Sequence, residues 1–163
     1  TYDPIFKVNP PLRSNEDVEA LRLALADGTI DAVATDHAPH PVEDKECEWS
    51  AAAFGMVGLE TALSVVVESM VNTGLLDWVG VADRMSYRPA HIGRVAGQGR
   101  PLAVGEPANI TLIDPAARWT VRPSELLSRS RNTPYGERTL PGKVVGTIFR
   151  GRQTVRDGAP VPC

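Results

Sequence analysis

The sequence predicts an α/β protein that carries a small β module in its carboxyl-terminal part. Over residues 5–35, short apolar runs flank a helical pattern, which is the strand, helix, strand order of a parallel sheet. After Gly97, glycine and proline instead punctuate short strand-like segments. We therefore expect two parts, residues 1–96 and residues 97–163.

The first part is expected to begin with a strand, a helix and a second strand. Residues 5–9 are the first predicted strand. Ser14 and Asp17 form a capping box in front of an apolar pattern with helical spacing, which Gly28 ends. The apolar run that follows predicts a buried strand at residues 30–35.

Helices dominate the rest of the first part. Residues 37–53 show no periodicity and are expected to form a polar, acidic loop. Apolar residues then recur at helical spacing over residues 59–70 and stop at Gly74. Two shorter helices are expected at about 79–86 and 89–95, the second with a proline in its first turn.

The β module is predicted from four strand-like segments. They lie at residues 109–114, 119–121, 144–149 and 154–156. The last two flank the tetrapeptide Arg-Gly-Arg-Gln at residues 150–153, which is a hairpin signature.

The composition is that of an ordinary globular protein, with 42% hydrophobic and 23% charged residues. Neither a membrane span nor a leader is visible, so we expect a cytoplasmic protein without a membrane partner. Cys47 and Cys163 make no disulfide framework, which fits a reducing compartment. The chain opens on Thr1 and runs directly into a predicted strand, so we expect a fragment of a longer protein.

Charge is distributed unevenly along the chain. Residues 1–60 hold twelve acidic and four basic side chains, whereas residues 118–163 hold nine basic and three acidic ones. The basic segment lacks interleaved stacking aromatics, which argues against a nucleic-acid partner. We expect a solvated face that complements the acidic half.

The hexapeptide at residues 35–40, Thr-Asp-His-Ala-Pro-His, carries the most chemical information. It follows a predicted buried strand, and α/β folds place their chemistry at the carboxyl ends of strands. Asp36 there can be a metal ligand, a general base or both, and it can also simply cap the next turn. Together with His37 and His40 it makes a mixed nitrogen and oxygen zinc site chemically possible. His91 is expected to be structural.

Two further segments could contact a ligand. Asn9 ends the first predicted strand, and its amide can donate to and accept from an amide substrate, although Asn-Pro-Pro is also a common turn. Phe54 and Gly55 lie where the acidic loop enters the long helix. Backbone amides at such an entry favour negative charge, although a plain loop-to-helix connection would look the same.

Three motifs together resemble the carboxyl-terminal part of the bacterial-type dihydroorotases, in the cyclic amidohydrolase superfamily. They are Val-Asn-Pro-Pro-Leu-Arg at 8–13, the hexapeptide at 35–40, and Phe-Gly-Met-Val-Gly-Leu-Glu-Thr at 54–61. The resemblance covers nearly the whole chain. It implies that residues 1–96 are the end of a metal-dependent (β/α)8 barrel and that residues 97–163 are part of a small β-sandwich. It also implies the reversible cyclisation of N-carbamoyl-L-aspartate to L-dihydroorotate in pyrimidine biosynthesis.

The resemblance implies a role for individual residues. Asp36 matches an aspartate at the metal centre that shuttles a proton between the attacking hydroxide and the ring nitrogen, and the implied cofactor is one or two zinc ions. His40 matches a histidine that binds the carboxylate of the substrate. Asn9 matches an asparagine that contacts the substrate ring, and Phe54 and Gly55 match a loop that contacts the substrate.

Most of the implied metal ligands are not in this sequence. A (β/α)8 barrel needs about 250 residues, and a catalytic zinc site uses at least three protein ligands. We therefore expect the 163 residues alone to be inactive and to need the missing amino-terminal part of the barrel. His37 is expected to make hydrogen bonds in its turn rather than to bind the metal.

Two alternatives stay open beside this interpretation. One is a hydantoinase or allantoinase of the same superfamily, although His40 and the Asn-Pro-Pro-Leu-Arg segment weigh against it. The other is a non-catalytic dihydroorotase-like subunit that scaffolds aspartate transcarbamoylase, although the presence of Asp36 and His40 argues against it. The expected partners are a small-molecule substrate and either a second copy of the protein or aspartate transcarbamoylase.

Overall fold

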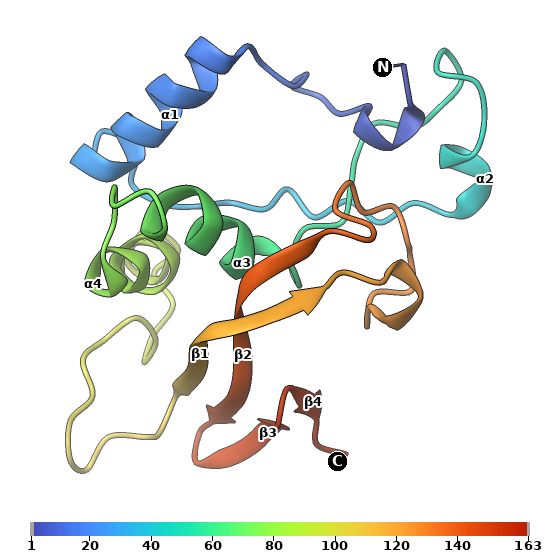
Figure 1. Ribbon diagram of the computed structural model, residues 1–163. Helices are drawn as coiled ribbons and strands as arrows, with labels where there is room; N and C mark the ends of the chain where they lie inside the picture. The colour runs from blue at the N-terminus through green and yellow to red at the C-terminus, as the bar shows by residue number, and fades with distance from the viewer. Residues whose placement is uncertain (1, 163) are drawn as a thin grey trace.

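The computed structural model describes residues 2–162 (Figure 1). Most of its helical elements precede its strands. The helical elements are η1 (Pro4–Phe6), α1 (Asn15–Asp27), α2 (Val42–Lys45), α3 (Ala62–Val66), η2 (Val67–Val71), α4 (Trp78–Ala82), η3 (Asp83–Tyr87), α5 (Arg88–Ile92) and η4 (Pro123–Glu125). The strands are β1 (Ile110–Thr120), β2 (Thr139–Phe149), β3 (Arg152–Arg156) and β4 (Ala159–Pro160).

Helix α1 forms as the sequence predicts. The Ser14 hydroxyl accepts a hydrogen bond from the Asp17 amide, and the Asp17 carboxylate accepts one from the Ser14 amide, both at 3.2 Å. Gly28 ends the helix with a φ of 92°, which glycine adopts without steric cost. Within Asn15–Asp27 no residue is buried, and α1 reaches the rest of the molecule through Leu25 and Ala26 near its carboxyl end (Figure 1).

The two strands predicted in the first part of the chain do not form among residues 2–162, so the prediction was wrong for this part of the protein on its own. Residues 4–6 make the single turn η1, which Asp3 caps by accepting from the Ile5 amide at 2.9 Å. Residues 30–35 cross the molecule as an irregular segment between α1 and α2 (Figure 1). A strand needs a neighbouring strand to complete its hydrogen bonds, whereas here the Val33 amide donates to a helix carbonyl, that of Arg84.

The two helical runs in the middle of the chain each contain a π-helical stretch. Residues 62–71 form one run, as the apolar spacing predicts, and residues 78–92 form another in place of two separate helices. In the second run the π-helical stretch η3 ends at Tyr87, two residues before Pro89, which has no amide proton to donate. The widened turn lets the helix continue through the proline. No helix within residues 2–162 is long and apolar enough to cross a membrane.

The four strands form one antiparallel sheet in the order β1-β2-β3-β4. The pairing of β1 with β2 is irregular between Asp114 and Arg118, where Pro115 cannot donate a ladder hydrogen bond. The chain resumes pairing after this irregularity. The segments predicted as separate strands at 109–114 and 119–121 are therefore one long strand.

The predicted hairpin is confirmed between β2 and β3. Arg150 and Gly151 connect the paired residues Phe149 and Arg152. Both connecting residues have positive φ, 50° and 82°, which is what a two-residue hairpin turn of type I′ requires.

The sheet packs against α3 and the loop that precedes it. One core cluster joins them: Val57, Val121, Leu126 and Leu140. The Ser64 hydroxyl of α3 donates to the Gly142 carbonyl at 2.7 Å and accepts from Trp119 Nε1 at 2.9 Å, which fixes the helix to both long strands. A second cluster lies among the helices: Val66, Met70 and Val81.

Candidate active site

Asp36 lies at the bend between the irregular segment 30–35 and the turn that follows. Its φ is 44°, in the left-handed region that aspartate tolerates better than most residues. Its side chain is exposed, and among residues 2–162 its carboxylate has no hydrogen bond or ion pair. A carboxylate with free oxygens can accept a proton or bind a cation. Within residues 2–162 the Asp36 side chain caps no turn, so its carboxylate is accessible to a ligand.

His37 makes hydrogen bonds, as expected, although to a more distant loop. Its Nδ1 accepts from the backbone amides of Gly58 at 3.1 Å and Leu59 at 3.3 Å. An Nδ1 that accepts carries no proton, so the neutral ring holds its proton on Nε2. A parallel bridge pairs the backbone of His37 with Met56. His37 therefore anchors the start of the α3 region against the Asp36 bend.

His40 lies beside the loop that contains Phe54 and Gly55. Its Nε2 is 2.9 Å from the Phe54 carbonyl, which only a protonated nitrogen can donate to. Its Nδ1 is 3.9 Å from the Asp44 carboxylate. The structure thus brings together three of the predicted site residues, with one imidazole nitrogen engaged by the loop and the other facing a carboxylate.

Gly55 can only be glycine in this arrangement. Its φ is 139°, and a Cβ built on it would lie 2.6 Å from the Ala38 Cβ and 2.8 Å from His40 Nε2. The backbone of Gly55 therefore touches the 35–40 turn directly. The neighbouring Phe54 ring is 57% exposed, so it is available for contact with a ligand.

Asn9 is exposed, and the backbone just before it is hydrogen-bonded to the loop that contains Gly55. The Gly55 amide donates to the Lys7 carbonyl at 2.9 Å, two residues before Asn9. The Asn9–Pro10 peptide is cis. No side-chain hydrogen bond of Asn9 is present among residues 2–162, so its amide is free to bind.

Asn132 is a functional candidate that the residue pattern did not single out. It is 5% exposed. Its Nδ2 donates to the carbonyls of Ala38 at 2.9 Å and Gly55 at 3.3 Å, and its Oδ1 accepts from the His40 amide at 3.3 Å. Asn132 thus clamps the 35–40 turn to the Gly55 loop. In the sequence Asn132 begins the segment Asn-Thr-Pro-Tyr at residues 132–135, and this segment is the signal that could have identified it.

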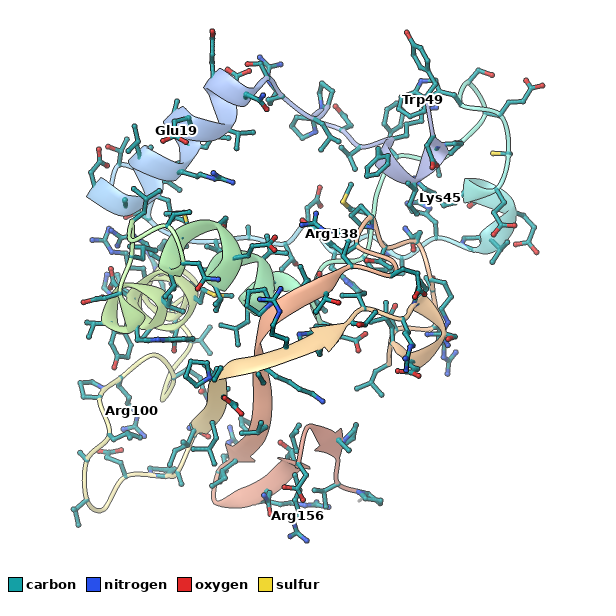
Figure 2. The ribbon with its side chains drawn as sticks, in the orientation of Figure 1. Glu19, Lys45, Trp49, Arg100, Arg138 and Arg156 are labelled. Carbon is teal, nitrogen blue, oxygen red and sulfur yellow. The ribbon has the colours of Figure 1, made fainter. Side chains whose placement is uncertain are left out.

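The sequence pattern also did not single out two buried lysines, Lys7 and Lys45. Lys7 is 7% exposed, and its Nζ donates to the carbonyls of Trp49 at 2.7 Å and Ser50 at 3.1 Å. Lys45 is 6% exposed and lies in the same corner of the molecule as Trp49 (Figure 2). Burial lowers the pKa of Lys45, and the charge of Lys7 lowers it further.

The described residues cannot hold a metal ion by themselves. Among residues 2–162 there is no group of three or more His, Cys, Asp or Glu side chains placed to bind one. Asp36 offers a single carboxylate, whereas a catalytic zinc site uses three protein ligands. Within residues 2–162, Asp36 can therefore contribute at most one carboxylate to a metal site.

The curated proteins to which this chain is similar include dihydroorotases of several bacteria. No family model matches the chain. The chain is 68% identical over 158 residues to a dihydroorotase of Streptomyces coelicolor and 57% identical over 158 residues to a dihydroorotase of Mycobacterium tuberculosis. Both matches cover 97% of this chain and 37% of the relative. The chain thus spans little more than a third of the length of the curated relatives it matches.

Solved structures of hydantoinases have the same fold over this chain. An L-hydantoinase (dihydropyrimidinase) from Arthrobacter aurescens has a TM-score of 0.89 at 33% identity, covering 99% of this chain and 36% of that one. A D-hydantoinase from Thermus sp. has a TM-score of 0.87 at 27% identity, covering 98% of this chain and 36% of that one. The chain matches the carboxyl-terminal part of the enzyme. The predicted α/β class is confirmed as a mixed α/β arrangement with an antiparallel sheet.

Proposed function

The chain belongs to the dihydroorotase family, and on that premise we propose that the protein of which it forms part is an active dihydroorotase. The reaction is the reversible cyclisation of N-carbamoyl-L-aspartate to L-dihydroorotate, a step of de novo pyrimidine biosynthesis. The observation that carries this proposal is the 68% identity over 158 residues to a dihydroorotase, against 33% identity to the L-hydantoinase.

We propose the architecture that this function requires. Residues 1–96 would be the end of a metal-dependent (β/α)8 barrel, and residues 97–163 would belong to a β-sandwich. The irregular segment 30–35 supports this proposal, because it lies without strand neighbours among residues 2–162, as a barrel strand would without the strands on either side.

The cofactor belongs to the same proposal. Family membership implies a metal in general. We propose zinc, one ion or two, with Asp36 as the ligand that this chain supplies and the remaining ligands in the rest of the protein. The exposed carboxylate, which has no partner among residues 2–162, fits that role. When bound, such a metal lowers the pKa of a water molecule and polarises the amide carbonyl.

Asp36 would also move the proton. In hydrolysis its carboxylate would accept a proton from the attacking water and return it to the ring nitrogen that leaves, and in cyclisation the order is reversed. Its carboxylate, without a hydrogen-bond partner among residues 2–162, and its position at a bend support this role, because a base must be positioned and unoccupied.

The substrate would be held by His40, Asn9, Phe54 and Gly55. A protonated His40 can donate through Nε2 to the Phe54 carbonyl and through Nδ1 to a carboxylate of the substrate, in place of Asp44 at 3.9 Å. The free amide of Asn9 would pair with the ring amide, and the Phe54 and Gly55 backbone would line the site. The contact of His40 with the Gly55 loop supports a shared surface.

The hydantoinase interpretation is the second candidate, since the TM-score of 0.89 to an L-hydantoinase favours a common site architecture. The full-length protein, assayed on L-dihydroorotate, hydantoin and allantoin, separates the candidates. We expect turnover of dihydroorotate well above the other two. Preferred turnover of hydantoin or allantoin would establish the second candidate, and no turnover of any would support the scaffolding subunit.

The proposed partners follow from the function. They are the small-molecule substrate, the amino-terminal part of the barrel, and either a second copy of the protein or aspartate transcarbamoylase. We propose a cytoplasmic location and no nucleic-acid or membrane partner. Sedimentation of the full-length protein, alone and mixed with aspartate transcarbamoylase, distinguishes the assemblies.

A further inference from the structure

The loop at residues 49–55 obtains most of its carbonyl partners from side chains. It has no regular secondary structure beyond isolated turns. The carbonyls of Trp49 and Ser50 accept from Lys7, and the carbonyl of Phe54 faces His40 Nε2. The conformation of this loop therefore depends on donors that come from other parts of the chain.

Lys45 is the most highly connected of these donors. From the last residue of α2, its Nζ donates to the carbonyls of Gly55 at 2.9 Å, Ala53 at 3.0 Å and Lys7 at 3.3 Å. An ammonium group has three protons, so these three acceptors satisfy it completely. Two of the acceptors flank Phe54, and the third lies two residues before Asn9.

We propose that Lys45 is a positioning residue for the substrate, which holds the Phe54–Gly55 backbone in register with the segment that carries Asn9. This proposal rests on the proposed function, in which the Phe54–Gly55 loop and Asn9 bind the same substrate. The direct hydrogen bond from the Gly55 amide to the Lys7 carbonyl joins the same two segments. The Lys45 ammonium group donates to the carbonyls of both Lys7 and Gly55 and so stabilises their close approach.

The charge of Lys45 has no carboxylate partner within residues 2–162, which distinguishes it from a structural ion pair. Its ligands are neutral carbonyls of Lys7, Ala53 and Gly55, which lie outside helices and strands, so its removal should affect the loop rather than a distant helix. Asp36 is not among its contacts. Loss of Lys45 should therefore change substrate binding much more than the chemical step.

The test uses the full-length protein with Lys45→Met, which keeps the length of the side chain and removes all three donors. We expect KM for L-dihydroorotate to rise about tenfold, with kcat within about threefold of wild type and with unchanged metal content. Lys45→Arg keeps the charge and several donors and should give an intermediate KM. Lys143→Met, at an exposed position of β2, is the matched control and should leave KM unchanged.

A purely structural lysine would give a different result. It would lower Tm and the fraction of active enzyme, and hence apparent kcat, while the folded fraction kept the wild-type KM. That outcome in Lys45→Met overturns the proposal. Lys45→Gln is measured in parallel in case the methionine variant does not fold, and a KM within about twofold of wild type in the glutamine variant overturns it equally.

Amide exchange separates this proposal from the proposed function. In Lys45→Met or Lys45→Gln, the Gly55 and Val57 amides should exchange faster than in wild type, while the amides of residues 62–71 keep their wild-type rates. Unchanged exchange at Gly55 overturns the proposal even if the enzyme is active. A wild-type protein that turns over no dihydroorotate refutes the proposed function, and the exchange data still decide whether Lys45 holds the loop.

Discussion

The antiparallel sheet and the loop region at residues 37–58 satisfy their backbone hydrogen bonds in different ways. In the sheet, strands β1 to β4 pair with one another through backbone hydrogen bonds. In residues 37–58, single side chains hold the backbone, chiefly Lys45 and Asn132. A ladder spreads its stabilisation over many equivalent bonds, whereas the loop region depends on each donor separately. Single substitutions should therefore cost more in the loop region, which carries the candidate site.

The largest expected effect comes from testing the chain without the rest of the protein. The isolated 163-residue chain should show no turnover of dihydroorotate and should bind zinc weakly, because residues 2–162 contain no group of three metal-binding side chains. Steady-state assays with added zinc and equilibrium dialysis measure both properties. Turnover by the isolated chain would show that the loop region is a complete site.

Asp36→Asn in the full-length protein should lower kcat by about 10²- to 10⁴-fold, because an amide cannot accept the proton. Asparagine also tolerates a positive φ, and the carboxylate has no partner among residues 2–162, so Tm should stay close to wild type. Stopped-flow or steady-state kinetics measure kcat, and a thermal melt measures Tm. Wild-type kcat would exclude Asp36 as the base.

Asn132→Ala should destabilise the protein by about 2–3 kcal/mol, because the His40 amide and the Ala38 carbonyl lose their partner in a buried place. The free energy of unfolding in urea measures this cost. Asn72→Ala is the control, because Asn72 is exposed at the end of η2 and should change stability little. Equal effects of the two substitutions would contradict the clamp role of Asn132.

His40→Ala should raise KM for dihydroorotate about tenfold, which corresponds to about 1.4 kcal/mol. The lost imidazole removes a donor for the substrate carboxylate and the contact with the Phe54 carbonyl. Initial rates over a range of substrate concentrations measure KM and kcat separately. An unchanged KM would count against His40 as a substrate ligand.

The smallest effect is expected in the sheet. Gly151→Ala should cost about 1 kcal/mol, because alanine is strained at a φ of 82° although nothing lies within 4 Å of the new Cβ. Gly55→Ala is its counterpart in the loop region and should cost clearly more, because its Cβ would meet the Ala38 Cβ at 2.6 Å. Urea unfolding of both variants measures the difference directly. Equal costs would erase the contrast between the two regions.

The parts of the fold that the sequence predicts are those with local causes. The capping box at Ser14 and the hairpin at Arg150–Gly151 each need only residues within a few positions, and both are confirmed. The strand predicted at residues 30–35 does not form among residues 2–162, because a strand needs neighbouring strands to pair with and an apolar run does not specify them. The division at residue 97 stays a prediction, and the core cluster packs Val57 against Val121 across it.

The residues of the candidate site, too, are predictable only where a local motif carries them. Asp36, His40 and Gly55 stand in recognisable motifs, and their roles stay proposals. Lys45 lies in an acidic stretch that resembles a solvated surface, and its burial is decided by carbonyls up to 38 residues away. Asn132 contacts a turn more than 90 residues earlier, a distance over which single-sequence periodicity carries no information.

The left-handed conformation of Asp36 limits which residues evolution can place there, independently of any reaction. At a φ of 44°, glycine, asparagine and aspartate are readily accommodated, and β-branched or bulky residues are strained. Of the three, aspartate alone carries a charge. The backbone thus favours glycine and asparagine among neutral replacements, so a lineage that gave up the carboxylate could still keep the bend.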